Sequence, residues 1–318
     1  MRKALIIYNP AAGRFPVKPF IRYVEKELGE AGWQVESTAT QNGEHTIQLA
    51  RQAAAQGCDA AFAVGGDGTV GQVASGLRGS ETALGVLPAG TSNVWAQELG
   101  LPSFTWLNWR RLRANARLLA DAQAYRVDMG RCNEYPFMMW AGMGLDAMAI
   151  HAIEPRARIE KFFAVPEYAA STIREASQWR GLRLSLQADG KEVKGQYILA
   201  VANNIRRYMG GLSELSPNAC LDDGLLDLWL FGGDSLADAF RHAYDLWRGS
   251  HVNSRDVQRI TFRELYVQAE APFFIHMDAE PKQATDHATI SVERHALKVL
   301  MPPKALTLLQ RTNGSPPG

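Results

Sequence analysis

One aspartate stands inside a glycine-rich turn in the stretch FAVGGDGTVGQVASGL, which covers residues 62–77. The glycines allow backbone N–H groups to approach a ligand closely, and a helix after them would add its positive N-terminal end. This arrangement suits phosphate, but the Asp67 carboxylate would repel phosphate unless a divalent cation lay between them. The residue types therefore predict a Mg²⁺–phosphate site. A tight turn in which Asp67 caps backbone amides is the alternative.

The same glycines, Gly66, Gly68 and Gly71, satisfy the G-x-G-x-x-G spacing of dinucleotide-binding folds. That interpretation requires an acidic residue about 20 positions further on, where this chain has Thr91. The turn also follows the third predicted strand rather than the first, and Asp67 would face the pyrophosphate. A P-loop is excluded because no G-x-x-x-x-G-K-[ST] sequence occurs.

Two more turns of small residues follow predicted strands. NPAAG (9–13) comes after an apolar strand at 4–8, and PAGTSN (88–93) overlaps the end of another at 83–88. Because the C-terminal ends of parallel strands share one edge, where ligands bind, the three turns are predicted to converge on one crevice. Their amide, hydroxyl and carboxylate groups favour a nucleotide site over ordinary turn chemistry.

The elements that must position these turns alternate between strand and helix patterns. Strands are predicted at 4–8, 34–40, 60–64 and 83–88, with helices at about 17–28, 44–56 and 66–77. Short strands that alternate with helices indicate a parallel sheet covered on both faces. The fold class predicted for residues 1–125 is therefore α/β with a parallel sheet.

After about residue 125 the pattern is typical of antiparallel strands joined by turns. Strands are predicted at 182–186, 197–201, 224–231, 260–268, 272–277 and 288–293, with helices at about 164–180 and 235–249. We therefore expect an antiparallel β-sandwich domain over 126–299. The C-terminal segment at about 300–312 is expected to pack back on the first domain.

Composition limits the class of protein. The 318 residues include 34 Lys and Arg against 33 Asp and Glu, and the resulting net charge of +1 argues against a nucleic-acid binder that works through bulk charge. No segment approaches the ~20 apolar residues that span a bilayer. The three cysteines are far apart and form no CxxC pair. We expect a cytoplasmic protein.

The ordered set of motifs resembles the diacylglycerol kinase catalytic family, which includes sphingosine kinases and soluble bacterial lipid kinases. The matching stretches are NPAAG (9–13), GGDGT (65–69), LPAGTSN (87–93), AGMGLDA (141–147), SPNACLDDGLLDL (216–228) and MDAE (277–280). GGDGT alone would also suit NAD kinases and phosphofructokinases. The ordered set is specific and spans nearly the whole chain.

The resemblance implies an ATP-binding domain, a β-sandwich and a lipid site in or near the cleft between them. Asp67 falls on the family's active-site aspartate, and Glu280 is implied to be the general base that accepts the proton of a lipid hydroxyl while Mg²⁺ neutralises phosphate charge. The residues implied to surround ATP are Asn9, Pro10, Ala11, Ala12, Gly13, Thr40, Gly65, Gly66, Asp67, Gly68, Thr69, Val70, Gly71 and Thr91.

The resemblance also implies a second, structural Mg²⁺, held by the Asp223 carboxylate and the backbone carbonyls of Cys220 and Leu225. An Asp-Gly turn between strands is the alternative. Two positions depart from the family pattern. Val94 stands where the family often has an aspartate that links this metal to the active site, and Ala279 replaces a glycine. If residue 279 needs a positive φ, alanine would cost roughly 1 kcal/mol or shift the loop.

We therefore expect a kinase that uses ATP and Mg²⁺ to phosphorylate a hydroxyl of a diacylglycerol-, glycerolipid- or sphingoid-type lipid. The alternatives are an NAD-kinase-like phosphotransferase with a polar acceptor and a non-catalytic nucleotide or lipid sensor. A long apolar cleft near Glu280 would favour the lipid kinase, a polar pocket the soluble acceptor and a closed cleft the sensor. The expected partners are the lipid substrate and, transiently, a membrane surface, with no nucleic acid; a homodimer is left open.

Overall fold

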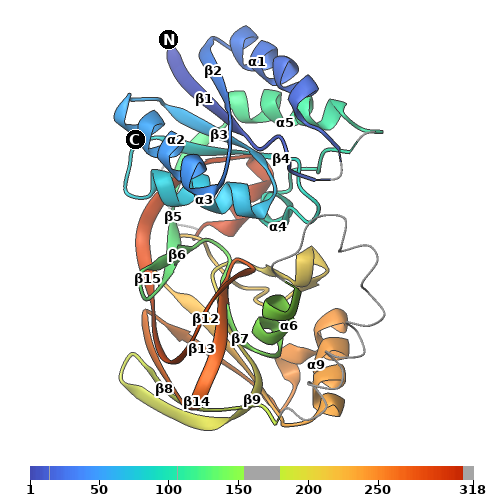
Figure 1. Ribbon diagram of the computed structural model, residues 1–318, viewed down its shortest axis with the longest axis vertical. Coiled ribbons are helices and arrows are strands. Elements are labelled where there is room, and N and C mark those ends of the chain that lie inside the picture. The colour runs from blue at the N-terminus through green and yellow to red at the C-terminus, as the bar shows by residue number, and fades with distance from the viewer. Residues whose placement is uncertain (14, 106, 154–179, 311–318) are drawn as a thin grey trace.

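Four short strands near the N-terminus build a parallel sheet in the order β2-β1-β3-β4. The structure, a computed structural model, describes residues 1–13, 15–105, 107–153 and 180–310 (Figure 1). Every residue of β3 and β4 is buried, as expected for parallel strands covered on both faces. The strands are β1 (Arg2–Tyr8), β2 (Trp33–Ala39), β3 (Ala60–Gly65) and β4 (Ala83–Pro88).

Helices cover both faces of this sheet. Figure 1 shows α1 and α5 together on one side and α2 and α3 together on the other. Asn42 caps α2, because its side chain accepts the N–H of His45 at 2.9 Å. The helical elements are η1 (Lys18–Phe20), α1 (Ile21–Glu30), α2 (Gly43–Ala55), α3 (Asp67–Leu77), α4 (Val94–Glu98) and α5 (Arg110–Ala120).

The second lobe is built mainly from antiparallel strands around a separate apolar core. Its long strands are β5 (Gln123–Cys132), β7 (Trp140–Gly144), β8 (Leu182–Ala188), β9 (Lys191–Asn203), β12 (Leu226–Gly232), β13 (Val257–Phe262), β14 (Glu264–Met277) and β15 (Glu280–Met301). Shorter elements are β6 (Tyr135–Phe137), α6 (Leu145–Ile153), β10 (Arg207–Tyr208), η2 (Met209–Gly211), β11 (Ser213–Glu214), α9 (Leu236–Arg248) and η3 (His251–Asn253). No described helix is long and apolar enough to cross a membrane.

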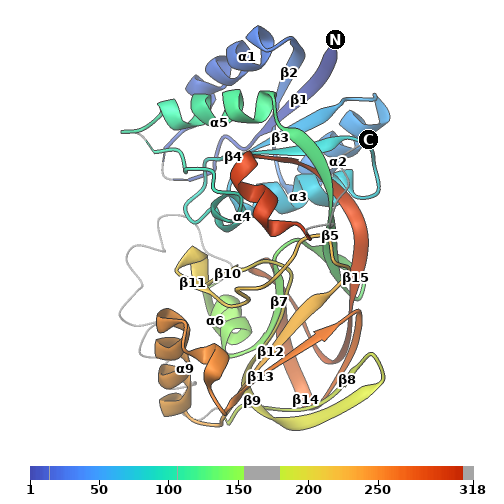
Figure 2. The same cartoon turned by 180° about the vertical axis from the view of Figure 1, so that it is seen from behind.

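Two strands connect the lobes. β5 and β15 pair with each other and run from one lobe into the other (Figure 1). β15 also pairs with β4 in parallel through Val299 and Leu84, so that 13 described strands share one hydrogen-bonded sheet. The chain then returns through η4 (Pro303–Leu308), where Leu308 accepts the N–H of Leu221 at 2.9 Å. Figure 2 shows η4 at the junction of the lobes.

The predicted fold class is confirmed, and three strand predictions need correction. The strand predicted at 260–268 is broken at Arg263, because the N–H groups of Arg263 and Glu264 donate to the Asp189 carboxylate. Residues 264–277 then form one strand, which includes the separate strand predicted at 272–277. The strand predicted at 288–293 is the middle of β15. Of the two predicted helices, the one at about 235–249 is confirmed as α9 (Leu236–Arg248), whereas residues 164–179 of the one at about 164–180 lie outside the described residues.

Candidate functional site

Three turns at the C-terminal ends of β1, β3 and β4 contact one another through their glycines. A Cβ atom added to Gly13 would lie 2.3 Å from the carbonyl oxygen of Ala89, and one added to Gly90 would lie 2.3 Å from the Cα atom of Gly66. The N–H of Ala89 donates to the carbonyl of Gly65 at 2.8 Å. Only glycine allows the backbones to approach this closely. The structure therefore brings together the three turns that were predicted to converge.

Side chains of the expected nucleotide site hold these turns in place. Asn9 Nδ2 donates to Thr69 Oγ1 at 3.3 Å, and Asn9 Oδ1 accepts the N–H of Ala11 at 2.9 Å. Thr40 follows β2, where its N–H donates to the carbonyl of Tyr8 at 2.9 Å and its side chain is buried. The ends of β1, β2 and β3 are thereby fixed at one edge of the sheet.

The other residues with expected nucleotide contacts are not equally accessible. Gly68 and Gly71 line a cleft between the lobes, whereas the Val70 side chain is buried in the core. Thr91 lies on a separate cavity of about 360 Å³, which it lines together with Phe104. In the first turn, Pro10 and Ala11 are exposed and Ala12 is buried.

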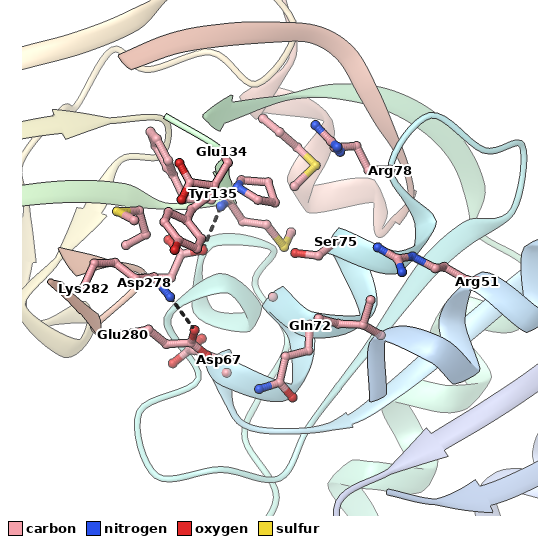
Figure 3. Close-up of a pocket in the computed structure, with 18 residues that line it drawn as sticks. Arg51, Asp67, Gln72, Ser75, Arg78, Glu134, Tyr135, Asp278, Glu280 and Lys282 are labelled. Carbon is pink, nitrogen blue, oxygen red and sulfur yellow. Dashed lines mark hydrogen bonds and ion pairs between the residues drawn. The ribbon is translucent and has the colours of Figure 1, made fainter. Parts of the chain in front are cut away.

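The cleft between the lobes has a volume of about 370 Å³ and two unlike walls (Figure 3). Helices α2 and α3 supply polar side chains to the first wall, among them Arg51, Gln72 and Ser75. The second lobe supplies a mainly apolar wall, which includes Met129, Tyr135, Pro136, Phe137, Met138 and Met277. Four carboxylates line the same cleft: those of Asp67, Asp278 and Glu280 belong to the motifs described above, and Glu134 is the fourth.

Asp67 begins α3 and is half-buried at the bottom of the glycine turn. Its Oδ1 accepts the N–H of Trp95 at 3.1 Å, so part of its role is to cap α4, as the alternative interpretation of this turn expected. Burial raises the pKa of the Asp67 carboxyl, although the backbone N–H groups of residues 93–95 oppose that shift. No ion pair between described residues involves this carboxylate.

Asp278 stands in the two-residue turn between β14 and β15, and sequence analysis gave it no role. Its carboxylate accepts three consecutive backbone N–H groups, from Met138 at 2.7 Å, Met139 at 2.8 Å and Trp140 at 3.1 Å. Burial raises the pKa of Asp278 to about 6, and the nearby charge of Asp67 adds to this shift while the three N–H groups oppose it. Two carboxylates are therefore held close together at the cleft.

Ala279, the second residue of this turn, has φ = 67°, and Asp278 before it has φ = 50°. This pair of left-handed residues matches a tight hairpin turn in which glycine is favoured at the second position. We expect Ala279→Gly to raise the free energy of unfolding by about 1 kcal/mol, because the positive φ no longer strains a Cβ atom. Chemical denaturation would measure the change. Ala284→Gly, at an exposed position of β15 without positive φ, should lower stability instead; equal effects at both positions would contradict the explanation.

Glu280 begins β15 and lies across the cleft from the glycine turn. Its Oε1 is 4.0 Å from the position that a Cβ atom on Gly68 would occupy. Its Oε2 is 3.5 Å from Lys282 Nζ, which in turn lies 4.7 Å from the centre of the Tyr135 ring (Figure 3). The Glu280 side chain is half-exposed, so its carboxylate remains accessible to a substrate.

A buried hydrogen-bond network connects the AGMGLDA stretch to this hairpin. Asp146 Oδ2 accepts the Tyr208 hydroxyl at 2.7 Å and lies 2.9 Å from Nε2 of His276, which precedes the turn by two residues. At the other end of α6, His151 Nε2 is 2.8 Å from the carbonyl oxygen of Lys282. Helix α6 therefore holds both strands of the hairpin that carries Asp278 and Glu280.

Several residues at the cleft were missed by sequence reasoning. The place of Lys282 could have been predicted. Residues two apart on a strand share a face, and Lys282 is two residues after Glu280. Arg51, Gln72 and Asp278 had none, since they meet the site only through helix packing or through contacts far apart in the chain.

The LDDGL stretch forms a turn stabilised by its own aspartate. Asp223 Oδ1 accepts the N–H of Leu225 at 3.0 Å, and the neighbouring Asp128 accepts the N–H of Gly224. Burial raises the pKa of Asp223, and the charges of Asp128 and two other aspartates add to this shift. Among the described residues, no group of three or more His, Cys, Asp or Glu side chains is arranged to hold a metal ion. A cation here would therefore depend on carbonyl oxygens or water.

Solved structures similar to this chain support the same two-lobed fold. A putative diacylglycerol kinase from Bacillus anthracis str. Sterne superposes with a TM-score of 0.76 at 21% identity, covering 96% of this chain and 98% of that one. An NAD kinase from Archaeoglobus fulgidus in complex with ATP superposes with a TM-score of 0.53 at 12% identity, covering 96% of each chain. At these identities the likeness concerns the fold alone.

Sequence comparison adds the family. The diacylglycerol kinase catalytic domain family matches residues 3–132, and the YegS C-terminal NAD kinase beta sandwich-like domain family matches residues 140–301. A diacylglycerol kinase of Bacillus subtilis (strain 168) is 27% identical over 304 residues, which is 95% of this chain and 97% of that protein. A diacylglycerol kinase of Mycobacterium tuberculosis (strain ATCC 25618 / H37Rv) is 30% identical over 308 residues, 94% of this chain and 95% of its own. The chain therefore belongs to the diacylglycerol kinase family of kinase enzymes.

Proposed function

We propose that this kinase transfers the γ-phosphoryl group of ATP to a hydroxyl of a diacylglycerol-, glycerolipid- or sphingoid-type lipid. The proposal rests on one arrangement: Asp67, Asp278 and Glu280 meet at a cleft between the glycine turns and an apolar wall. The relatives named as diacylglycerol kinases and the NAD kinase in complex with ATP support the choice of a lipid acceptor and of ATP, respectively.

In this proposal the triphosphate lies against the turns that contain Gly13, Gly66 and Gly68, where backbone N–H groups bind its oxygens. Mg²⁺ would be held by Asp67 and Asp278 together with phosphate oxygens and water, which is the usual way that proteins bind it. The two carboxylates fit this ion, because the charge of Asp67 helps to raise the pKa of Asp278 and no described ion pair offsets either charge, so that a bound cation would relieve the repulsion between them. When bound, Mg²⁺ would neutralise charge on the phosphates.

Glu280 would accept the proton of the acceptor hydroxyl. At the same time the hydroxyl oxygen forms a bond to the γ-phosphorus, and the bond between the γ-phosphorus and ADP breaks. A general base must lie within hydrogen-bond reach of that proton and remain accessible to it. Glu280 meets the second condition, and it faces Gly68 across the cleft. Lys282 would orient the Glu280 carboxylate and balance its charge.

The apolar wall of the cleft favours a lipid over a polar acceptor. Phe137, Met138 and Met277 lie beside Asp278 and Glu280, where an NAD-kinase-like enzyme would need polar groups that bind a second ribose or base. The cleft is also open between the described residues, which speaks against the closed cleft expected of a sensor.

The structural Mg²⁺ is a separate part of the proposal. The Asp223 carboxylate and the backbone carbonyls of Cys220 and Leu225 would hold it, and hard oxygen donors of this kind suit the ion. A cation would also offset the repulsion between Asp223 and its acidic neighbours.

The experiment that tests the proposed function mixes the protein with radiolabelled ATP, Mg²⁺ and a panel of detergent-dispersed acceptors. The panel contains diacylglycerol, monoacylglycerol and sphingosine, with NAD as the polar alternative, and a parallel set contains EDTA. Labelled lipid that disappears with EDTA is the expected result. Labelled NAD phosphate would favour the polar acceptor, and ATP binding without any labelled product would favour a sensor.

The pH dependence of the reaction should reflect Asp278. An aspartate of ordinary pKa stays ionised at pH 5, whereas burial raises the pKa of Asp278 to about 6, so this carboxyl takes up a proton as the pH falls through that value. The protonated group binds a cation poorly and loses one acceptor oxygen. We expect kcat/KM for MgATP to fall about tenfold for each pH unit below about 6, since that ratio reports the free enzyme.

The raised pKa of Asp278 also distinguishes this loss of activity from unfolding in acid. The raised pKa means that the folded state favours the protonated form of Asp278, so the contribution of this group to stability rises as the pH falls through about 6. Activity at pH 5 should therefore fall while the thermal midpoint does not, and should return on dilution to pH 7.5. A profile that is flat down to pH 5 would contradict the assignment.

A further inference from the structure

Helix α9 exposes a row of aromatic side chains to solvent. Phe240, Tyr244 and Trp247 are four and three positions apart, which places them on one face, and they are 72%, 53% and 71% exposed. The opposite face packs on the second lobe through His242 and Leu246, which are buried. Figure 1 shows α9 at the outside of that lobe. Large exposed aromatic residues grouped on one face mark an interaction surface rather than a chance exposure.

The helix that carries these side chains is well formed, so their exposure is not the result of fraying. Ser235 caps its N-terminus by accepting the N–H of Asp238, and the Ser235 hydroxyl donates to the Asp238 carboxylate at 2.6 Å. Gly249 ends the helix in the left-handed conformation, as C-caps require.

Two segments that contact α9 also expose apolar side chains. Leu212 is 79% exposed, and the next residue, Ser213, donates its hydroxyl to the carbonyl of Leu246 at 2.7 Å. Val252 in η3, which contacts α9, is also exposed. We call Phe240, Tyr244, Trp247, Leu212 and Val252 together the α9 face.

Charge on α9 is partly compensated within the protein. Arg241 pairs with Asp238 at 3.0 Å and with Asp256 at 2.5 Å. Arg248 Nη1 donates to the Tyr244 hydroxyl at 2.9 Å, and its guanidinium lies over the Tyr244 ring. Of the two arginines of α9, Arg241 is neutralised and Arg248, whose described partner is a hydroxyl, keeps its charge, so the described part of the face offers one free cation rather than an array for a polyanion. Aromatic rings edged by arginine are the composition that lies at the boundary between headgroups and acyl chains of a membrane.

The size of the α9 face also favours a bilayer over a second copy of the chain. Phe240, Tyr244 and Trp247 are 53–72% exposed, so at roughly 150–250 Å² each they present on the order of 400 Å², about half of the roughly 800 Å² per partner in a stable protein interface. Interfacial binding of an amphipathic helix needs only a few aromatic side chains that enter the headgroup region.

We propose that the α9 face is the surface through which the protein docks on a lipid bilayer. This inference rests on the proposed function, because a lipid acceptor must be taken from a membrane. Docking is peripheral: Phe240 and Trp247 enter the headgroup region, Tyr244 and Arg248 lie at its polar edge, and the rest of α9 stays on the protein.

Sedimentation with sucrose-loaded vesicles of phosphatidylethanolamine and phosphatidylglycerol tests the surface without any enzyme assay. The double variant Phe240→Gln/Trp247→Gln keeps good helix formers at exposed sites, so circular dichroism and the thermal midpoint should match those of the parent. We expect vesicle partitioning to fall by at least ~10-fold, because two aromatic anchors are lost. Leu107→Gln, a change of the same kind at a residue 89% exposed on the other lobe, should leave partitioning unchanged.

A kinetic arm separates this proposal from the proposed function. The double variant should lose ~10-fold or more of the parent's rate on diacylglycerol embedded in vesicles, and keep the parent's rate on a short-chain diacylglycerol dissolved below its aggregation limit. If the parent phosphorylates neither acceptor, the proposed function fails, and sedimentation still decides the docking surface. Equal vesicle binding by parent and double variant would overturn the docking proposal. The docking proposal would also be overturned if the parent formed a dimer, the double variant were a monomer, and the two bound vesicles equally.

Discussion

Replacement of Glu280 by glutamine should lower kcat by a factor of about 10² to 10⁴ while KM for ATP changes little. The amide has the shape of the carboxylate and cannot accept the proton of the attacking hydroxyl. The folded state should tolerate the change, since the only described ion pair of Glu280 is a half-exposed one with Lys282 at 3.5 Å, and such pairs contribute about 1 kcal/mol or less. Initial rates at saturating MgATP with micellar diacylglycerol measure the effect.

Glu134 provides the matched control for this experiment. It is the other glutamate of the same cleft, and it lies in the turn between β5 and β6 rather than opposite the glycine turn. Glu134→Gln removes the same charge from the same cleft and should keep kcat within about threefold, since no proton transfer depends on it. Similar losses in both variants would indicate a general effect of cleft charge and would remove Glu280 from the role of base.

The sequence was most informative where local pattern and the rules of parallel sheets agree. The apolar run 60–64 followed by GGDGT placed Asp67 at a strand end, and two similar turns located the shared edge at which Gly13, Gly66 and Gly90 now meet. This worked because the register of parallel strands brings their C-terminal ends together whatever the side chains are. The turn residue Ala279 was also recognisable, because it stands where the family pattern has glycine, and the structure gives it the positive φ that glycine favours.

The predictions were poorest where a contact joins distant parts of the chain. In the sequence, Asp278 has the features of a charged residue at the end of a strand. No residue near it in the chain indicates that its carboxylate accepts the three N–H groups of residues 138–140. The helix-borne groups Arg51 and Gln72 face the cleft only because α2 and α3 pack side by side. β15 was predicted as a short strand because its outer residues do not alternate regularly in polarity, although pairing with β5 and β14 keeps the whole segment extended.

Removal of the Asp278 carboxylate should have the largest effect on stability of any single change near the cleft. Asp278→Ala leaves the N–H groups of Met138, Met139 and Trp140 without their acceptor, and each such loss costs about 1–3 kcal/mol with incomplete additivity. We expect the free energy of unfolding to fall by roughly 3 kcal/mol. Activity should be lost as well, because the site loses a carboxylate proposed to hold Mg²⁺, and the hairpin that carries Glu280 keeps only the backbone bond from the Asp278 N–H to the Trp140 carbonyl as its described link to residues 138–140.

Two companion variants separate hydrogen bonding from charge at this position. Asp278→Asn keeps one acceptor oxygen, so that the N–H groups of Met139 and Trp140, which share Oδ1, stay paired while the site loses its charge. It should recover much of the stability lost in the alanine variant and little of the activity, since a neutral amide holds Mg²⁺ weakly. Asp286→Ala, at an exposed position of β15, should unfold close to the parent's midpoint. If Asp278→Ala unfolds at the parent's midpoint, the three hydrogen bonds do not anchor the hairpin; if Asp278→Asn retains the parent's rate, the carboxylate charge has no part in binding the metal.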